Sequence, residues 1–246
     1  MPEIKLIDLY CYYGKGKKEN LVISEMNETF PNGKISVIMG PSGCGKTTLL
    51  KSMLGILEYD GDIIFDSTDI YNIPTYKRNM AYINQDVSLY PHMTIFDNIA
   101  FPLKNQKMER DELFKRVRHI AERFGIAHCL NVKPKYLSLG QQQRALLARE
   151  LVREPSVILM DEPVSHLDAV SKKDILDFIK EMNKELKKTI IYVTHSYKEA
   201  LEIADRIYVM EEGRFILKGS PNKIMESSDE FVMKMKEADL YEEKKD

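Results

Sequence analysis

Short apolar runs, each ending at a polar or glycine-containing segment, recur along this chain. A continuous run of this kind is typical of a strand that is buried on both faces of a parallel sheet. Other segments place apolar residues every three to four positions, which is the pattern of an amphipathic helix. The pattern therefore predicts a domain in which strands and helices alternate. Strands are expected over residues 4–9, 35–39, 63–65, 80–84, 157–160, 189–193, 206–210 and 215–217.

A long helical stretch interrupts this alternation. Thr94 precedes an apolar-rich segment that has Asp97 at its third position, so Thr94 is predicted to cap a helix over residues 95–103. A second helix is predicted to end at Gly125, because six apolar side chains before it share one helical face. These are Leu113, Phe114, Val117, Ile120, Ala121 and Phe124. Residues 86–153 are therefore predicted to form a helical insertion.

Turn and cap residues predict the other boundaries. Asp60-Gly61 is predicted to form a tight hairpin turn, and Glu212-Gly213 is predicted to turn the last hairpin. Ser171 and Asp174 are predicted to cap the helix that follows them. The core is then expected over residues 1–85 and 154–230, followed by a charged tail over residues 231–246 that frays at its end.

Composition narrows the class of protein. The 36 Lys and Arg residues nearly balance the 38 Asp and Glu residues, for a formal net charge of -2, so nucleic-acid binding is not expected. Cys11, Cys44 and Cys129 are far apart, which argues against a disulfide framework and a zinc site and favours a reducing compartment. No apolar run approaches the length of a membrane span, and the first residues lack the plan of a signal peptide. A membrane role would therefore need another protein as the anchor.

Eight residues at a predicted strand-to-helix turn carry the clearest chemistry. They match the phosphate-binding pattern G-x-x-x-x-G-K-[ST] and are Gly40, Pro41, Ser42, Gly43, Cys44, Gly45, Lys46 and Thr47. Glycines let the backbone turn its N–H groups toward an anion, and the helix N-terminus adds partial positive charge. Lys46 is predicted to reach the outer phosphates, and the Thr47 hydroxyl is predicted to ligate magnesium. An accidental match arises in a chain of this length with a probability on the order of one in a hundred.

Two further strand ends carry polar groups. Asp161 and Glu162 follow a buried strand, and the carboxyl end of such a strand is where ligands bind in open α/β sheets. Asp161 is predicted to hold magnesium, and Glu162 to orient a water or accept its proton; a plain surface turn is the alternative. His195 ends the next strand. A lone histidine is most often structural, but at this position it could donate to a terminal phosphate.

Other features fit structural and functional interpretations alike. Ser138 and Gln141 form the pattern of a capping box, so they could simply begin a helix, but an exposed helix N-terminus after a serine is also an anion site. These residues alone favour neither interpretation. Tyr13 belongs to an aromatic cluster of the kind that usually packs in a core, and beside a nucleotide loop it could instead stack on adenine.

In their order and spacing these stretches resemble the ATPase subunit of an ATP-binding cassette (ABC) transporter, over residues 4–230. The resemblance implies a P-loop NTPase with an ABC ATPase core that has a mixed sheet, an N-terminal antiparallel β subdomain and an inserted α-helical signature subdomain. Residues 1–246 then form one ABC ATPase domain that binds ATP and Mg²⁺. The matching motifs are the Walker A at 40–48, the Q-loop at Gln85, the LSGGQ signature at 137–141, the Walker B at 157–163, the D-loop at 165–168 and the switch histidine at His195.

The same resemblance implies a role for each matching residue. It implies catalytic roles for Glu162, His195, Lys46 and Gln85. It implies that magnesium is held by Thr47, Gln85 and Asp161. Contacts to nucleotide are implied for Tyr13, Gly40, Pro41, Ser42, Gly43, Cys44, Gly45, Lys46, Thr47, Thr48, Ser138, Gly140, Gln141 and Asp168. The signature departs from the family at Leu139, where a glycine is usual. This departure implies a slower or asymmetric site, and a degenerate site in a heterodimer is the rival explanation.

Partners are implied as well. In this family two subunits, alike or different, close on two ATP molecules, each between one Walker A and the other subunit's signature helix. Residues 89–101 resemble importer ATPases for sugars and related solutes, so permease subunits are expected to dock near residues 85–101 at the cytoplasmic face of the membrane, with an extracytoplasmic solute-binding protein in the complex. Many sugar-importer ATPases carry a further β-domain, and this chain ends before one, which leaves the sugar assignment open.

Two alternatives remain at this stage. A soluble ABC ATPase, for example one that serves iron-sulfur cluster assembly, would share every catalytic residue. A P-loop kinase would need neither the signature residues 138–141 nor a dimer. Only the docking segment separates the transporter interpretation from the first alternative.

Overall fold

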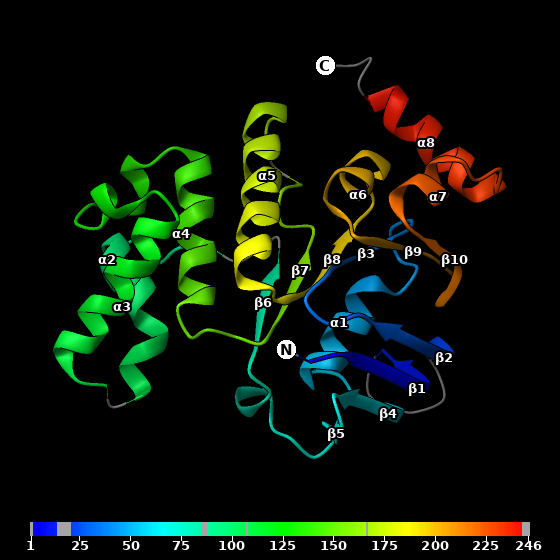
Figure 1. The fold of residues 1–246 in the computed structure, drawn as a ribbon, viewed down its shortest axis with the longest axis horizontal. Helices are drawn as coiled ribbons and strands as arrows, with labels where there is room; N and C mark the ends of the chain where they lie inside the picture. The colour runs from blue at the N-terminus through cyan, green and yellow to red at the C-terminus, as the bar shows by residue number, and fades with distance from the viewer. Residues whose placement is uncertain (1, 14–20, 85–87, 107, 166, 243–246) are drawn as a thin grey trace. The chain divides into compact units, whose positions relative to one another are not determined.

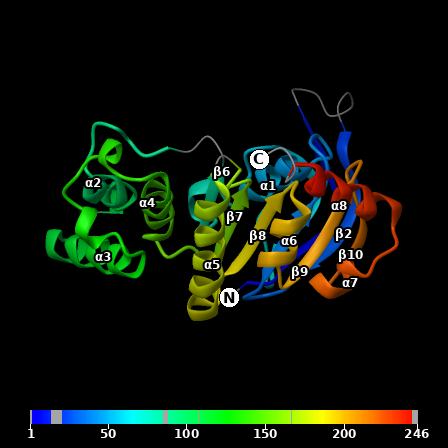
Figure 2. The same ribbon diagram turned by 90° about the horizontal axis from the view of Figure 1, so that it is seen from above.

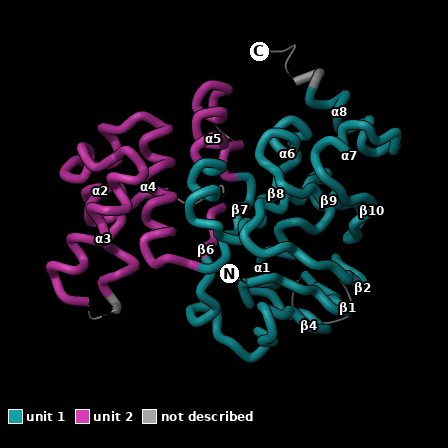
Figure 3. The backbone as a smooth tube through the Cα atoms, in the orientation of Figure 1, with its two compact units in different colours: residues 1–80, 156–162, 179–246 teal, residues 81–155, 163–178 magenta. Residues whose placement is uncertain are grey.

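The computed structural model describes residues 2–13, 21–84, 88–106, 108–165 and 167–242. It divides into two compact units (Figure 3). The first comprises residues 1–80, 156–162 and 179–246, and the second comprises residues 81–155 and 163–178. The segment 86–153 that was expected to be helical thus falls in the second unit, which also takes in residues 163–178. None of the helices in the described ranges is long and apolar enough to cross a membrane.

Two sheets build the first unit (Figure 1). The smaller is antiparallel, in the order β2-β1-β4-β5, which confirms the expected N-terminal antiparallel subdomain. The larger sheet is mixed, because β9 and β10 are antiparallel while β9, β3, β8 and β7 run parallel in that order. The strands are β1 (Ile4–Tyr12), β2 (Leu21–Phe30), β3 (Ile35–Met39), β4 (Tyr59–Phe65), β5 (Thr68–Asp69), β7 (Val157–Asp161), β8 (Thr189–Thr194), β9 (Arg206–Glu211) and β10 (Arg214–Gly219). A further strand, β6 (Met80–Asn84), begins at the boundary between the units.

The buried apolar runs form the centre of the larger sheet, as expected. Every residue of β3, β7 and β8 is buried. Helix α1 (Lys46–Leu54) contacts β1 and β2 of the smaller sheet and also β7 of the larger one, so it lies between the two sheets (Figure 1). Figure 2 shows the larger sheet from above. The short helix α6 (Tyr197–Ile203) packs on β3 and β8, and the chain ends in α7 (Pro221–Met225) and α8 (Glu230–Glu242).

The hairpin turn predicted at Asp60-Gly61 is wrong, because both residues lie inside β4. Gly61 has φ +88°, and a Cβ there would lie 2.2 Å from the carbonyl oxygen of Asp8 in β1. The β1–β4 register shifts at this point, between Ile7 and Tyr10. The glycine is therefore required by a close approach of two strands, and the turn itself comes later, at Asp66, where φ is +53°.

The predicted caps Ser171 and Asp174 are also wrong, because both lie inside helix α5 (Ala169–Leu186). Oδ1 of Asp168 accepts hydrogen bonds from the backbone N–H groups of Ser171 at 3.0 Å and Val170 at 3.1 Å, so Asp168 caps the helix. The hydrogen bonds from Ser171 lower the pKa of the Asp168 carboxyl. At the other end of the chain, α8 occupies most of the region expected to be a charged tail, and its Val232 is buried. Fraying was expected over residues 242–246; Glu242 is the last residue of α8, and residues 243–246 lie outside the described residues.

Helices dominate the second unit. Thr94 caps α2 as predicted, with its Oγ1 accepting from the Asp97 N–H at 3.1 Å. The helix ends at Ala100, earlier than expected, and continues as a 3₁₀ helix over Phe101–Gln106, where Pro102 has no N–H for an α-helical bond. The α-helices of this unit are α2 (Ile95–Ala100), α3 (Arg110–Arg123), α4 (Leu139–Leu151) and the first half of α5, with further 3₁₀ turns at Ala127–Cys129 and Pro134–Tyr136.

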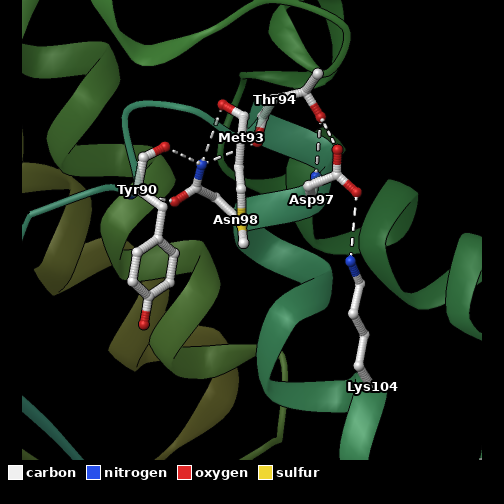
Figure 4. A network of polar contacts seen from close by, with 6 residues as sticks. All are labelled: Tyr90, Met93, Thr94, Asp97, Asn98 and Lys104. Carbon is white, nitrogen blue, oxygen red and sulfur yellow. Dashed lines mark hydrogen bonds and ion pairs between the residues drawn. The ribbon is translucent and has the colours of Figure 1, made fainter.

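A buried amide organises the loop before α2 (Figure 4). Asn98 is fully buried, and its Oδ1 accepts from the Tyr90 N–H at 2.7 Å. Its Nδ2 donates to the carbonyl oxygens of Tyr90 at 3.1 Å and Thr94 at 2.9 Å, and more weakly to that of Met93 at 3.5 Å. One side chain thus bonds backbone groups of three residues, Tyr90, Met93 and Thr94, and fixes the path of the loop between them.

Replacing Asn98 with Ala should lower the free energy of unfolding by about 1–3 kcal/mol, because the Tyr90 N–H loses this acceptor and the carbonyls of Tyr90 and Thr94 each lose one of two donors. Urea unfolding followed by circular dichroism measures the change. Asn131→Ala, the same substitution at an exposed position of the same unit, is the control and should leave the free energy of unfolding nearly unchanged. Equal stability of the two variants would contradict the organising role of Asn98.

Candidate active site

The register of three parallel strands gathers chemistry-bearing residues at one edge of the larger sheet. Met39, the last residue of β3, pairs with Thr194, the last residue of β8, and β7 ends beside them at Asp161. The residues that follow these ends are the phosphate loop, His195 and Glu162. The carboxyl edge of a parallel sheet is the usual ligand site of such folds. The structure thus brings together the three predicted parts of the site that lie in the first unit.

The phosphate loop joins β3 to α1 as predicted. Gly45 is the N-cap residue of α1 and has φ +109°, a conformation that a side chain would strain. The loop residues Pro41, Ser42 and Gly43 are exposed, as is Thr47 in the first turn of the helix. An exposed loop that leads into a helix N-terminus offers backbone N–H groups and partial positive charge to an anion.

Lys46 is the cation of this loop. Its side chain is nearly buried, at 5% relative exposure, and Nζ donates to the carbonyl oxygens of Gly40 at 2.7 Å and Pro41 at 2.8 Å. A buried ammonium is costly unless it is paired, and these two partners are neutral. The loop therefore retains a positive charge suited to phosphate. Burial raises the pKa of the neighbouring Cys44 thiol, so that residue stays uncharged.

Glu162 and His195 form a pair across the ends of β7 and β8. Oε1 of Glu162 lies 3.1 Å from Nδ1 of His195, and both side chains remain partly exposed. The backbone of Glu162 has φ +49°, and its N–H donates to the Val193 carbonyl at 3.0 Å. A left-handed conformation in a residue other than glycine costs free energy and is often found at functional sites. At Glu162 the chain leaves the extended conformation of β7, and the side chain lies against His195.

The residues of this edge fit a magnesium ion that arrives with phosphate. Thr47 presents a hydroxyl at the exposed start of α1, and Asp161 presents a carboxylate at the end of β7. Within the described ranges, no cluster of three or more His, Cys, Asp or Glu side chains could hold a metal ion by itself. Mg²⁺ commonly takes only one or two protein ligands and completes its shell with phosphate oxygens and water. Its third predicted ligand, Gln85, lies outside the described residues.

The signature residues begin helix α4 in the second unit. The predicted capping box is present, because Ser138 Oγ accepts from the Gln141 N–H at 3.3 Å and Gln141 Oε1 accepts from the Ser138 N–H at 3.1 Å. A hydroxyl that accepts here can still donate to a ligand. Leu139 is 57% exposed, and a Cβ at Gly140 would meet no atom within 4 Å. The fold of this chain therefore does not require a glycine at position 140.

The structure does not test the nucleotide contacts that were predicted for two other residues, Tyr13 and Asp168. Tyr13 is 59% exposed at the end of a described segment. Asp168 uses one carboxylate oxygen to cap α5. Their contacts with nucleotide stay predictions.

Sequence reasoning missed the residues that hold the segment after Gln85. Arg149 of α4 is nearly buried, donates to the Ser88 carbonyl at 3.0 Å and lies 5.0 Å from the centroid of the Tyr90 ring. Together with Asn98 it fixes the loop over residues 88–94 from two helices. The available signal was a pair of polar residues, Asn98 and Arg149, on otherwise apolar helix faces, where polar groups need defined partners.

Comparison with known proteins agrees with this arrangement. The family model described as "ABC transporter" matches residues 23–165. The trehalose/maltose import ATP-binding protein MalK of Thermococcus litoralis is 41% identical over 231 residues, covering 91% of this chain and 61% of MalK. The molybdate/tungstate import ATP-binding protein WtpC of Pyrococcus horikoshii is 45% identical over 198 residues, covering 80% of this chain and 57% of WtpC. The chain thus spans about three fifths of the length of these curated relatives.

A solved structure matches the whole fold. The cbiO1 protein of Clostridium perfringens, described as part of the ABC transporter complex cbiONQ, superposes with a TM-score of 0.83 at 32% identity. The match covers 94% of this chain and 92% of cbiO1. The fold predicted from the sequence motifs is therefore confirmed.

Proposed function

Because this chain belongs to the ABC transporter family, we propose that it binds ATP on the loop at residues 40–48, hydrolyses it, and so drives import of a solute through membrane subunits. The observation that carries the proposal is the convergence of the Lys46 loop and the Glu162–His195 pair at one sheet edge. Import is supported by the names of two relatives of this chain, both import ATP-binding proteins.

The chemistry assigns separate tasks to the residues of that edge. A water oxygen attacks the γ-phosphorus, and the bond from that phosphorus to the β–γ bridging oxygen breaks, so ADP leaves with the bridging oxygen. Glu162 orients the water and takes its proton. Lys46 and the loop amides hold the phosphate oxygens, and His195, whose Nδ1 lies 3.1 Å from Glu162 Oε1, donates to a γ-phosphate oxygen.

Magnesium supplies charge neutralisation at the β- and γ-phosphate oxygens when it is bound. Thr47 and Asp161 would hold it, together with Gln85. Tyr13 would stack on adenine, since a flat aromatic ring offers a large contact at a small entropic cost.

The proposal includes a second ATPase subunit. Ser138, Gly140 and Gln141 of one copy would meet the γ-phosphate held by the other, and Asp168 would lie near it. Phosphate held between helix N-termini of two chains joins those chains only until it is cleaved. The loop over residues 88–94, fixed by Asn98 and Arg149, would pass this movement to permease subunits docked near residues 85–101. The chain would then lie peripherally at the cytoplasmic face of the membrane, as a subunit of a complex that also includes an extracytoplasmic solute-binding protein.

The identity of the cargo is a separate matter. A sugar cargo is supported by MalK, whereas WtpC, at comparable identity, is named for molybdate and tungstate. In a transporter of this plan the solute contacts the membrane and binding subunits. The proposal therefore stops at solute import.

Purification of the tagged chain from detergent-solubilised native membranes tests the proposal. We expect integral membrane subunits to co-purify, and the complex to release phosphate from Mg-ATP without any acceptor. A soluble ABC ATPase would release phosphate but bring down no integral protein. A kinase would consume ATP only when an acceptor is supplied, and either of these results would overturn the proposal.

A further inference from the structure

A closed set of hydrogen bonds surrounds the backbone of His195. The N–H of Ser196 donates to Thr194 Oγ1 at 3.0 Å, and Thr194 Oγ1 donates to Glu199 Oε2 at 2.8 Å. The N–H of Glu199 donates back to Ser196 Oγ at 3.2 Å. Each residue beside His195 is thus tied to the first turn of α6. The His195 side chain, by contrast, is 46% exposed and directed to Glu162.

Glu199 is the buried end of this set. It is 5% exposed, and its Oε2 also accepts from the Tyr192 hydroxyl at 3.1 Å. The Tyr192 side chain is completely buried in β8, so these hydrogen bonds are anchored in the sheet at the Glu199 end. The position of Thr194 is therefore fixed by the core of the first unit.

The other end is held by the C-terminal helix. Oδ2 of Asp239 in α8 accepts from the Ser196 hydroxyl at 3.0 Å and from the Lys198 N–H at 2.7 Å. Helix α8 packs beside α6, also in the first unit (Figures 1 and 2). Asp239 is 43 residues from Ser196 in sequence, so this contact depends on the docking of α8 and not on local structure. One carboxylate oxygen thereby holds two groups of the turn that follows His195.

We propose that Asp239 is a positioning residue for His195, through which the C-terminal helix α8 sets the placement of that ring opposite Glu162. The proposal rests on the proposed ATPase function for its effect on turnover, but the placement of His195 can be measured without turnover. When α8 is docked, Ser196 is fixed on both sides, by Thr194 and by Asp239. When the Asp239 contact is lost, Ser196 keeps only its bonds within the turn, and the histidine beside it gains freedom to leave Glu162.

Three variants of the full chain separate this role from general stabilisation. Asp239→Ala removes both acceptor contacts. Asp239→Asn keeps a side-chain oxygen in the same place and should preserve them. Glu237→Ala is the matched control, because it removes an exposed carboxylate from the same helix. All three are compared well below their unfolding temperatures, so that every sample is folded.

The first readout is ATP turnover. We expect Asp239→Ala to lower kcat roughly tenfold with less than about a twofold change in KM for ATP, because the phosphate loop is untouched and only a reacting-site group is misplaced. Asp239→Asn should retain most of the activity, and Glu237→Ala should match the wild type. A purely structural role would lower the melting temperature and leave kcat of the folded protein unchanged, and that result would overturn the proposal.

The second readout is the ring signal of His195 in NMR spectra, assigned by its loss in His195→Gln. We expect Asp239→Ala to shift or broaden this signal, and Asp239→Asn and Glu237→Ala to leave it in place. An unchanged signal in Asp239→Ala would overturn the proposal whether or not the chain hydrolyses ATP. Absence of ATP hydrolysis in the wild-type complex would instead count against the proposed function, and the NMR comparison would still decide the role of Asp239.

Discussion

Glu162→Gln should abolish ATP turnover, with a fall of at least about a hundredfold in kcat, while ATP affinity stays within about twofold of the wild type. The amide keeps the shape of the side chain but cannot take a proton from water at neutral pH. The backbone N–H of Glu162 keeps its hydrogen bond to the Val193 carbonyl in this variant, so the loop should keep its path. Phosphate release from Mg-ATP and binding of a fluorescent ATP analogue measure the two quantities.

The chain offers a closely matched control for this variant. Glu212 also has positive φ, at +43°, and also follows a strand of the same parallel set, β9. Its side chain is exposed, and Glu212→Gln makes the same chemical change without touching His195. Because bound ATP would no longer be cleaved, Glu162→Gln should also run as a dimer in the presence of Mg-ATP. Near wild-type hydrolysis by Glu162→Gln would remove the role given to this residue.

Lys46→Met should weaken ATP binding roughly ten- to a hundredfold, since a charge-assisted contact to phosphate contributes about 1.5–3 kcal/mol. The substitution replaces a buried ammonium, held by the Gly40 and Pro41 carbonyls, with an apolar side chain of similar length. Isothermal titration with Mg-ATP gives the affinity.

Lys51→Met is the control for that change, because Lys51 lies in the last turn of the same helix, away from the loop. It should bind ATP as the wild type does. Unchanged affinity in Lys46→Met, or an equal loss in both variants, would show that the loop does not hold phosphate through this lysine.

The parts of the site that lie next to one another in sequence could be predicted from it. The phosphate loop is a contiguous pattern between a buried apolar run and a helix, and the structure has β3 and α1 on either side of it. Two continuous apolar runs predict strands that are buried on both faces, and Asp161, Glu162 and His195 lie at their ends. A shared sheet edge then follows from the rule that parallel strands end together.

Two of the missed features, at Gly61 and Asp239, depend on contacts between residues that are far apart in sequence. Gly61 was taken for a turn, because its local sequence does not reveal that Asp8 of β1 approaches it. The cap of α5 was missed for another reason: Asp168 bonds the N–H groups of Val170 and Ser171, which is a local pattern, but the residue was assigned to the ligand alone. The contact from Asp239 to Ser196 had no signal in the sequence, because nothing local to α8 indicates where that helix docks.

A crystal structure of Glu162→Gln with Mg-ATP is the most direct test of the central claim, that the triphosphate is held by the loop of one copy and the signature helix of another. We predict the γ-phosphate within hydrogen-bond distance of Lys46 from one chain and of Ser138 from its partner. A γ-phosphate bound only by its own chain, with the Ser138 helix directed elsewhere in every copy, would contradict the claim and leave a nucleotide-binding protein of another kind.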